Sequence, residues 1–288
     1  MSTWRTITNR LVTVSLVILA GAFISATLVR YAPGFGTDEQ QLDARLSRES
    51  IQALRSESSA ERNVAPYYVG WLRRTLRGDL GTSRSMGRPV SQLLIERAGT
   101  TLRVVAKSLT IAWIAAVSLV VATWTVHSAP LEKTCTIASG LLLCLPVGAV
   151  ALLLILLNGP GYLALVAIVF SKVHRYLSDL VGATGGMSHI VAARAKGISE
   201  LRLLFWHVIP AIRREVLALA GVSIALAVNA AIPVEALCGI PGIGQLAWHS
   251  ALARDLPVLL NVSWLVIAFT VLANSGADLL ADERGRTA

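Results

Sequence analysis

The sequence predicts an all-α integral membrane protein with six transmembrane helices. Three observations support this fold class: 54% of the 288 residues are hydrophobic, only 15% are charged, and the mean hydropathy is +0.63. Soluble domains contain about 45–50% apolar and about 25% charged residues, so one soluble core cannot hold this surplus. The same composition excludes a disordered chain and a disulfide-rich secreted module.

Six apolar runs correspond to the predicted spans, in chain order 11–29, 104–126, 135–157, 162–180, 216–234 and 256–280. A helix needs about 20 predominantly apolar residues to cross the hydrocarbon core of a bilayer. The fourth run is strongly apolar only at its start, and it reaches spanning length through Lys172, His174 and Arg175.

The first and third runs each leave an alternative open. Residues 11–29 exceed the 7–15 apolar residues of a secretory signal, so we expect an uncleaved anchor rather than a cleaved signal peptide. Pro146 and Gly148 interrupt the third run and predict a kink. Such a kink would either permit gating or be compensated by the neighbouring helices.

Charges in the short loops predict the orientation of the chain. With a cytoplasmic N-terminus, the inner side carries twelve basic residues and the short outer loops carry only Arg254. Because basic residues are retained on the cytoplasmic side, both termini are expected there. The net charge of +9 then reflects orientation in a lipid bilayer, and no nucleic-acid partner is expected. The predicted organisation is an N-terminus with the first span (1–29), an extracytoplasmic segment (30–101) and a core of five spans (102–288).

The extracytoplasmic segment has two halves of different character. Residues 37–65 are polar, with Leu42, Leu46, Ile51 and Leu54 at loosely helical spacing, so they form either a small amphipathic helix or a solvated loop. Gly78 to Ser83 suit a tight turn. Pro89 suits the first turn of a helix that continues into the second span.

A basic loop between the fourth and fifth spans contains the most distinctive pattern, at 186–212. Two alanines precede Arg194-Ala195-Lys196-Gly197, which predicts a helix with a thin face and a sharp end at the glycine. Ser199 is then expected to cap a second helix, from Arg202 to His207. Such a helix–turn–helix would either dock into a groove of another protein or lie as a basic hairpin on anionic lipid.

This loop resembles the cytoplasmic "EAA" loop of the membrane-spanning permease subunits of bacterial ATP-binding-cassette importers, in particular the B-type subunit of the peptide/nickel group. Ala192, Ala193, Gly197, Ile209 and Pro210 fall in the register of that motif. Two positions differ from the motif, because Val191 replaces its glutamate and His207 its isoleucine.

Three further stretches resemble the same family and occur in the same order. They are Tyr31-Ala32-Pro33-Gly34; Gly78 to Ser83 with Arg88-Pro89-Val90; and Val234-Glu235 with Pro241-Gly242-Ile243-Gly244 and Arg254-Asp255-Leu256-Pro257. The resemblance covers most of the chain and is weakest at 37–65 and 120–180.

The resemblance implies a type I importer fold in a bacterial inner membrane, with this chain as one half of the translocation pathway. Implied partners are a second homologous permease, two ATP-binding subunits and an extracytoplasmic solute-binding protein. The loop would be the coupling helix, with contact residues Ala192, Ala193, Arg194, Lys196, Gly197, Ser199, Glu200, His207 and Pro210.

Since the chain lacks the phosphate-binding motif GxxxxGK[ST], we do not expect it to be an enzyme, and ATP and Mg²⁺ would be held by the partner subunits. Peptides lead as cargo, ahead of nickel chelates and other small solutes.

Polar residues in the spans are few. Glu235 and Asp278 lie near span ends, and the central parts carry no ionisable group, which counts against the runner-up function, a stand-alone secondary carrier or channel. A structural membrane anchor is the third alternative. Ser223, Asn229 and Asn261 are candidates to line the pathway or to hydrogen-bond between helices.

Two further groups of residues complete the sequence-based predictions. Pro241, Gly242 and Gly244 form either a re-entrant hairpin at an outer gate or an ordinary outer loop. The three cysteines and five histidines show no spacing typical of a metal site.

Overall fold

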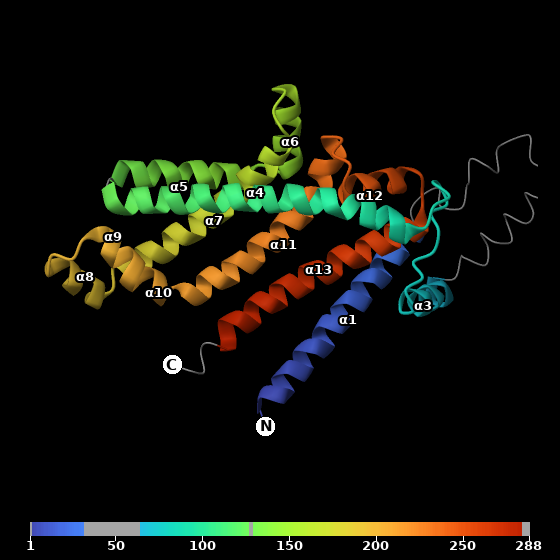
Figure 1. Ribbon diagram of the computed structural model, residues 1–288, viewed down its shortest axis with the longest axis horizontal. Coiled ribbons are helices and arrows are strands. Elements are labelled where there is room, and N and C mark those ends of the chain that lie inside the picture. The colour runs from blue at the N-terminus through green and yellow to red at the C-terminus, as the bar shows by residue number, and fades with distance from the viewer. Residues whose placement is uncertain (1, 32–63, 127–128, 284–288) are drawn as a thin grey trace, which may run out of the picture. The chain divides into compact units, whose positions relative to one another are not determined.

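The computed structural model describes residues 2–31, 64–126 and 129–283, and these ranges are helical apart from turns and one isolated bridge between Thr82 and Pro89. In chain order the elements are α1 (Ser2–Tyr31), α3 (Val64–Thr75), α4 (Val90–Val126), α5 (Ala129–Cys144), α6 (Val147–Leu156), α7 (Tyr162–Gly185), α8 (Ser188–Ala195), α9 (Glu200–Leu203), the π-helical turn η2 (Leu204–Val208), α10 (Ile209–Ala211), α11 (Arg213–Leu237), α12 (Ile243–Leu252) and α13 (Leu256–Glu283) (Figure 1). The predicted all-α class is therefore confirmed for the described ranges. The expected amphipathic helix or loop at 37–65 lies almost entirely outside them.

Three of the described helices are long and apolar enough to cross a membrane: α4, α11 and residues 256–276 of α13. A fourth span results if α5 and α6 are counted as one broken span. In α1, the apolar part of the residues searched is 12–25, which is shorter. The membrane-spanning character is thus confirmed, while the number of six spans stays a prediction.

Helix α4 is longer than the predicted second span, which was placed at 104–126. Its 37 residues correspond to about 56 Å, against a hydrocarbon thickness of about 30 Å. The N-terminal turns carry Glu96, Arg97 and Arg103, so the apolar C-terminal part is the portion suited to the bilayer. The helix begins at Val90, so Pro89 lies directly before it and not, as the sequence predicts, within its first turn.

The third apolar run is interrupted at its proline. Helices α5 and α6 meet at an angle of 97°, and the break lies at Leu145 and Pro146. Proline cannot donate the backbone hydrogen bond that would continue α5, which accounts for the position of the break. A kink was predicted here, but the run forms two helices rather than one bent helix.

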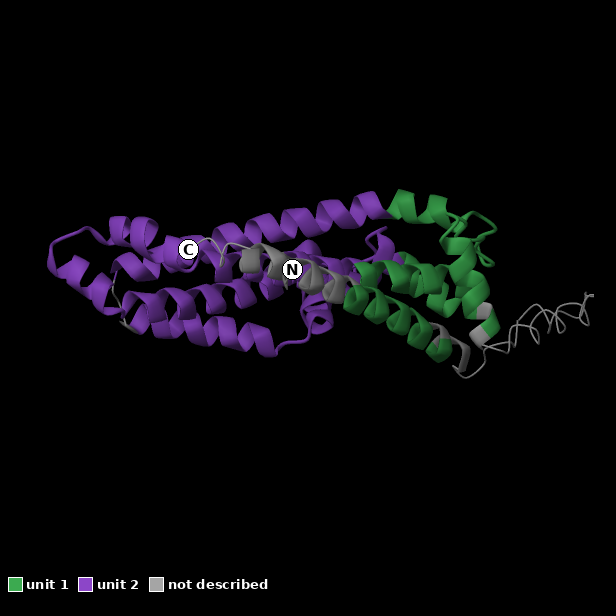
Figure 2. Ribbon diagram, turned by 90° about the horizontal axis from the view of Figure 1, so that it is seen from below, with its two compact units in different colours: residues 1–97, 246–268 green, residues 98–245, 269–288 purple. Residues whose placement is uncertain are grey.

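By contacts, the chain separates into two compact units, residues 1–97 with 246–268 and residues 98–245 with 269–288 (Figure 2). In the second unit, α7 packs against both α5 and α11. The core of this unit contains small side chains as well as large ones: Ala112, Ala116, Ala164 and Ala227 are fully buried in it. Small side chains let the helix backbones approach closely, as is typical of packing in membranes.

In the first unit, α1 packs against α3. The Tyr68 hydroxyl donates a 2.8 Å hydrogen bond to the Leu19 carbonyl, and its ring stands edge-on to Phe23 at 5.4 Å. After α3 the chain turns sharply at Gly78 and Gly81, with φ of 83° and 78°. These angles strongly favour glycine, so the tight turn predicted here is confirmed.

Candidate functional site

The segment between α7 and α11 is a compact helix–turn–helix. Helix α8 ends at Ala195, and Gly197 follows with φ of 81°. The Gly197 amide donates to the Arg194 carbonyl at 3.0 Å, so the turn closes directly on the end of the helix. Because Gly197 lies in the left-handed region, a side chain here would be strained, and the predicted sharp helix end is confirmed.

The second half of the segment differs in detail from the prediction. Ser199 occupies the position before α9, but its side chain makes no capping hydrogen bond, so the expected hydroxyl cap is wrong. Instead, its backbone carbonyl accepts the Leu203 amide at 2.9 Å. The helical path runs from Glu200 through η2 to Ala211 rather than from Arg202 to His207 alone. Pro210 has no N–H to offer the preceding turn, which accounts for the wider π turn just before it.

Three side chains fix the turn to the end of α4. The Arg194 guanidinium forms two hydrogen bonds with the Glu200 carboxylate, at 2.7 and 3.1 Å. It also lies over the Trp124 ring, 5.2 Å from the centroid. The Trp124 Nε1 donates a 3.0 Å hydrogen bond to the Glu200 carbonyl. Paired charge-assisted bonds add geometric specificity as well as energy, so Arg194 and Glu200 join α8 to α9, and the contacts of Trp124 join both to α4.

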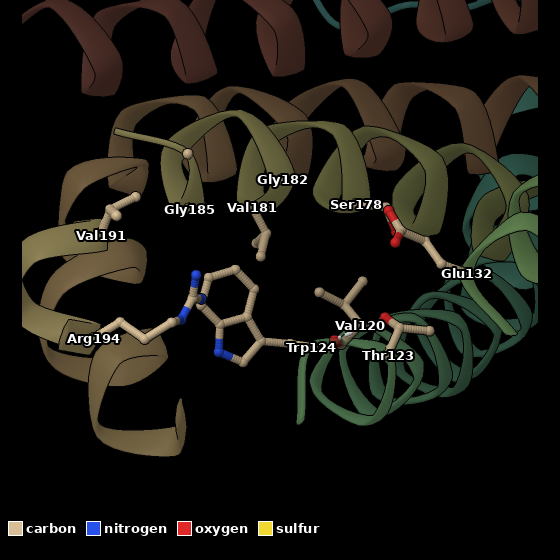
Figure 3. Close-up of a pocket in the computed structure, with 11 residues that line it drawn as sticks. Val120, Thr123, Trp124, Glu132, Ser178, Val181, Gly182, Gly185, Val191 and Arg194 are labelled. Atoms are coloured by element: carbon tan, nitrogen blue, oxygen red, sulfur yellow. Dashed lines mark hydrogen bonds between the residues drawn. The ribbon is translucent and has the colours of Figure 1, made fainter. Parts of the chain in front are cut away.

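Beside this network lies a cavity of about 390 Å³, lined by residues of α4, α5, α7 and α8. Arg194 and Trp124 point toward each other at one end of it, and Glu132 of α5 lies at the other (Figure 3). Gly182 and Gly185 of α7 form part of the wall. A Cβ on Gly185 would lie 2.6 Å from the Trp124 ring, so the position of that ring requires a glycine.

The outer surface of the turn is exposed and mostly small. Ala192, Ala195, Lys196 and Gly197 are exposed, while Ala193 is half-buried. On the opposite side, Ile190, Leu203 and Leu204 are buried in the core of the second unit or beside it. Of the other predicted contact residues, His207 and Pro210 are exposed. The turn itself therefore presents a thin surface, whereas the helices on either side of it expose larger apolar side chains: Val191, Leu201, Phe205 and Trp206.

The three polar residues proposed for pathway lining lie in different surroundings. Ser223 is fully buried, and its hydroxyl accepts a 3.0 Å hydrogen bond from Trp113 Nε1, which joins α11 to α4. Asn261 is buried at the start of α13 and donates to the Leu80 carbonyl at 3.0 Å. Asn229 alone of the three is exposed, although its amide also donates to the Thr270 hydroxyl at 3.1 Å.

The predicted gate residues form a tight junction with α11. The backbone amides of Ile243 and Gly244, the first two of α12, donate to Thr101 Oγ1 at 2.8 Å and to Glu235 Oε2 at 2.7 Å. Glu235 is fully buried, and Gly242 packs directly on its carboxylate. The Glu235 carboxylate, which lies near the end of α11, therefore faces neighbouring elements of the chain rather than water.

A second buried carboxylate organises the first unit. Asp255 accepts hydrogen bonds from the hydroxyls of Ser83 and Ser85, at 2.5 and 2.8 Å, and from the Ser85 amide at 3.0 Å. It therefore fixes the turn after α3 to the connection between α12 and α13. Both stretches belong to the resemblance noted from the sequence, but their contact joins residues more than 170 positions apart.

The sequence did not predict a role for Trp124, which contacts Arg194 and Glu200, or for Thr101, which accepts the Ile243 amide. For Trp124, the available signal was a tryptophan at the end of an apolar helix. For Thr101, it was only the acid, together with the Gly-x-Gly that Thr101 contacts. Neither signal specifies a partner. Within the described residues, no group of three or more His, Cys, Asp or Glu side chains could hold a metal ion.

These features define a class of protein: a helical membrane protein with a compact helix–turn–helix between α7 and the membrane-spanning helix α11. Residues 108–282 match the family of binding-protein-dependent transport system inner membrane components. The chain belongs to this family, and it is a permease subunit of an ATP-binding-cassette importer of the peptide/nickel group.

Similar proteins cover nearly the whole chain. A putative peptide permease protein of Brucella suis biovar 1 (strain 1330) is 26% identical over 91% of this chain and 92% of its own length. The nickel import system permease protein NikB of Staphylococcus aureus (strain MRSA252) is 24% identical over 96% and 89%. The oligopeptide transport system permease protein AppB of Bacillus subtilis (strain 168) is 25% identical over 92% and 93%.

Proposed function

We propose that this chain forms half of the translocation pathway of an ATP-driven peptide importer and that residues 186–212 transmit the movement of a separate ATPase subunit. The observation that carries the proposal is the rigid attachment of the α8–Gly197 turn to α4 and α9. A force applied to an exposed, rigid element passes to the helices that it contacts. A flexible loop would absorb the same force.

The proposed assembly has six spans in this chain, a type I importer fold and both termini in the cytoplasm. A second homologous permease completes the pathway. Two ATP-binding subunits sit below and hold ATP and Mg²⁺, and a solute-binding protein docks outside. The excess of basic residues on one side of the spans supports this orientation. This chain itself performs no covalent chemistry.

Asn229 is the strongest candidate among the three residues proposed to line the pathway. An exposed amide in the middle of an apolar helix is unfavourable against lipid, so it is expected to face a partner helix or a water-filled path. All three side chains form hydrogen bonds inside the fold, but Ser223 and Asn261 are buried and Asn229 is exposed. We propose the two buried residues as supports of the pathway rather than contacts of the solute.

Peptides are the proposed cargo because two of the relatives described above are named as peptide or oligopeptide permeases. Nickel chelates are the second candidate, since another relative is a nickel import permease. Mass spectrometry of the ligand retained by the co-purified solute-binding protein distinguishes the two. Peptides in that fraction support the proposal, and a nickel complex contradicts the peptide assignment.

The coupling role is tested with Gly197→Val in the reconstituted complex. Valine is strained at a φ of 81°, so the turn should distort and solute uptake should be abolished while membrane insertion is retained. Gly99→Val is the matched control, because Gly99 is exposed in α4 and a Cβ there meets nothing within 4 Å.

Two measurements of uptake separate the alternatives, one on the Gly197→Val complex and one on the purified chain alone. Normal uptake by Gly197→Val would contradict the coupling role. Uptake by the purified chain alone in liposomes, without ATPase subunits, would favour a secondary carrier or channel.

A further inference from the structure

The N-terminus of α12 is held by side chains from two other helices. The first four amides of a helix have no partner within it. Here the first two, Ile243 and Gly244, are taken by Thr101 of α4 and Glu235 of α11. We name Thr101, Glu235, Gly242, Ile243 and Gly244 the outer junction.

Packing around the outer junction leaves no space for adjustment. A Cβ on Gly242 would lie 2.2 Å from Glu235 Oε2, and one on Gly244 would lie 2.5 Å from the Ile232 backbone. Glu235 itself has no exposed surface. The connection between α11 and α12 is therefore pressed against the last turns of α11, and two of its glycines are required by close approach.

One oxygen of the buried carboxylate is unsatisfied. Glu235 Oε1 has no hydrogen-bond partner, whereas Oε2 accepts the Gly244 amide. A buried polar atom without a partner costs free energy. An apolar residue of similar size would avoid this cost but would leave the Gly244 amide without its acceptor. What the carboxylate contributes at this position is therefore the link to the start of α12.

We propose that residues 241–244 form part of an outer gate, and that Glu235 is a positioning residue that ties the start of α12 to α4 and α11, so that this gate segment moves together with these two helices during transport. This inference rests on the proposed function. The direct link is the hydrogen bond from the Gly244 amide, and Thr101 supplies the second link through the Ile243 amide. A movement of α4 or α11 then reaches the gate segment without passing through a flexible loop.

The test measures solute transported per ATP hydrolysed in the complete reconstituted complex. Glu235→Gln keeps an acceptor oxygen of the same reach and should keep most of the wild-type ratio. Glu235→Ala removes the acceptor and should lower the ratio about tenfold or more, with ATP hydrolysis and complex assembly retained. A purely structural role would lower the amount of assembled complex and leave the ratio per complex unchanged.

A second pair of variants applies if Glu235→Ala fails to assemble. Thr101→Val removes the hydroxyl that accepts the Ile243 amide and should lower the same ratio. Thr100→Val is the matched control, because the Thr100 hydroxyl only accepts a 3.4 Å bond from exposed Arg103, and it should leave the ratio unchanged.

The outcomes separate the inference from the proposed function. A normal ratio in Glu235→Ala, or an equal loss in Glu235→Gln and Glu235→Ala, would overturn the positioning role. If Glu235→Ala does not assemble, a normal ratio in Thr101→Val would overturn it. Absence of ATP-dependent transport in the wild-type complex would instead overturn the proposed function.

Discussion

At the scale of single residues, space around a Cα atom decides which glycines can be replaced. Gly182 and Gly185 lie three residues apart on α7, and both line the cavity beside Arg194 and Trp124. A Cβ on Gly185 would lie 2.6 Å from Trp124, whereas one on Gly182 would meet nothing within 4 Å. Two similar glycines thus differ in role, because only one of them bears on the network around Arg194.

Gly185→Ala is therefore expected to displace the Trp124 ring and weaken the attachment of α8. Overpacking of this kind costs about 1–3 kcal/mol, and we expect a lower unfolding temperature of the detergent-solubilised protein together with lower uptake. Gly182→Ala serves as the control and should match the wild type in both measurements. Equal behaviour of the two variants would contradict the role assigned to Trp124.

Asp255 provides a prediction about pH. Burial alone would raise the pKa of this carboxyl, but hydrogen bonds from Ser83, Ser85 and the Arg84 amide outweigh it and hold the pKa below its ordinary value. A carboxylate with a lowered pKa stabilises the fold above its unfolded pKa, about 3.9. This contribution is lost as the pH falls through the folded value.

Asp255→Asn should therefore destabilise the protein by about 2 kcal/mol at pH 7, measured by thermal unfolding in detergent. The difference from the wild type should shrink as the pH falls below about 4. Asp79→Asn, at an exposed aspartate in the same turn, should have little effect. A difference that stays constant with pH would show that the Asp255 charge is not what holds the turn.

At the scale of elements, local sequence predicts where helices start and stop but not what they contact. Hydropathy predicted α4, α11 and α13, because an apolar run is a feature of the local sequence. Gly197 predicted the end of α8, because a positive φ favours glycine. Proline marked the break between α5 and α6, yet the angle of 97° depends on packing around it. Ser199 illustrates the limit, because its suitability as a cap did not decide what its side chain does.

The helix–turn–helix is expected to act as one unit, because Arg194 and Glu200 share two hydrogen bonds. Arg194→Gln and Glu200→Gln should each lower transport per ATP by about tenfold, and the double variant should be no worse than either single variant. The measurement is a double-mutant cycle in the reconstituted complex. Additive losses would show that the two residues act separately.

At the scale of the whole molecule, the family could be predicted from the sequence, but the long-range contacts of Asp255 and Trp124 could not. The motifs around Gly197 and Gly242 to Gly244 are continuous in sequence, so they indicated a permease. The Asp255 carboxylate, by contrast, binds Ser83 across 172 positions, and Trp124 reaches Glu200 across 76. Such contacts follow from the arrangement of helices, which a single sequence does not specify.

Labelling of intact cells tests the central claim most directly. Cysteine is introduced at Ala192, in α8, or at Gly99, in α4, after replacement of Cys135, Cys144 and Cys238 by serine. Both introduced positions are exposed. A membrane-impermeant maleimide should label Gly99→Cys in intact cells and Ala192→Cys only after the membrane is opened. Labelling of Ala192→Cys in intact cells would place the helix–turn–helix outside the cell and contradict its coupling to a cytoplasmic ATPase.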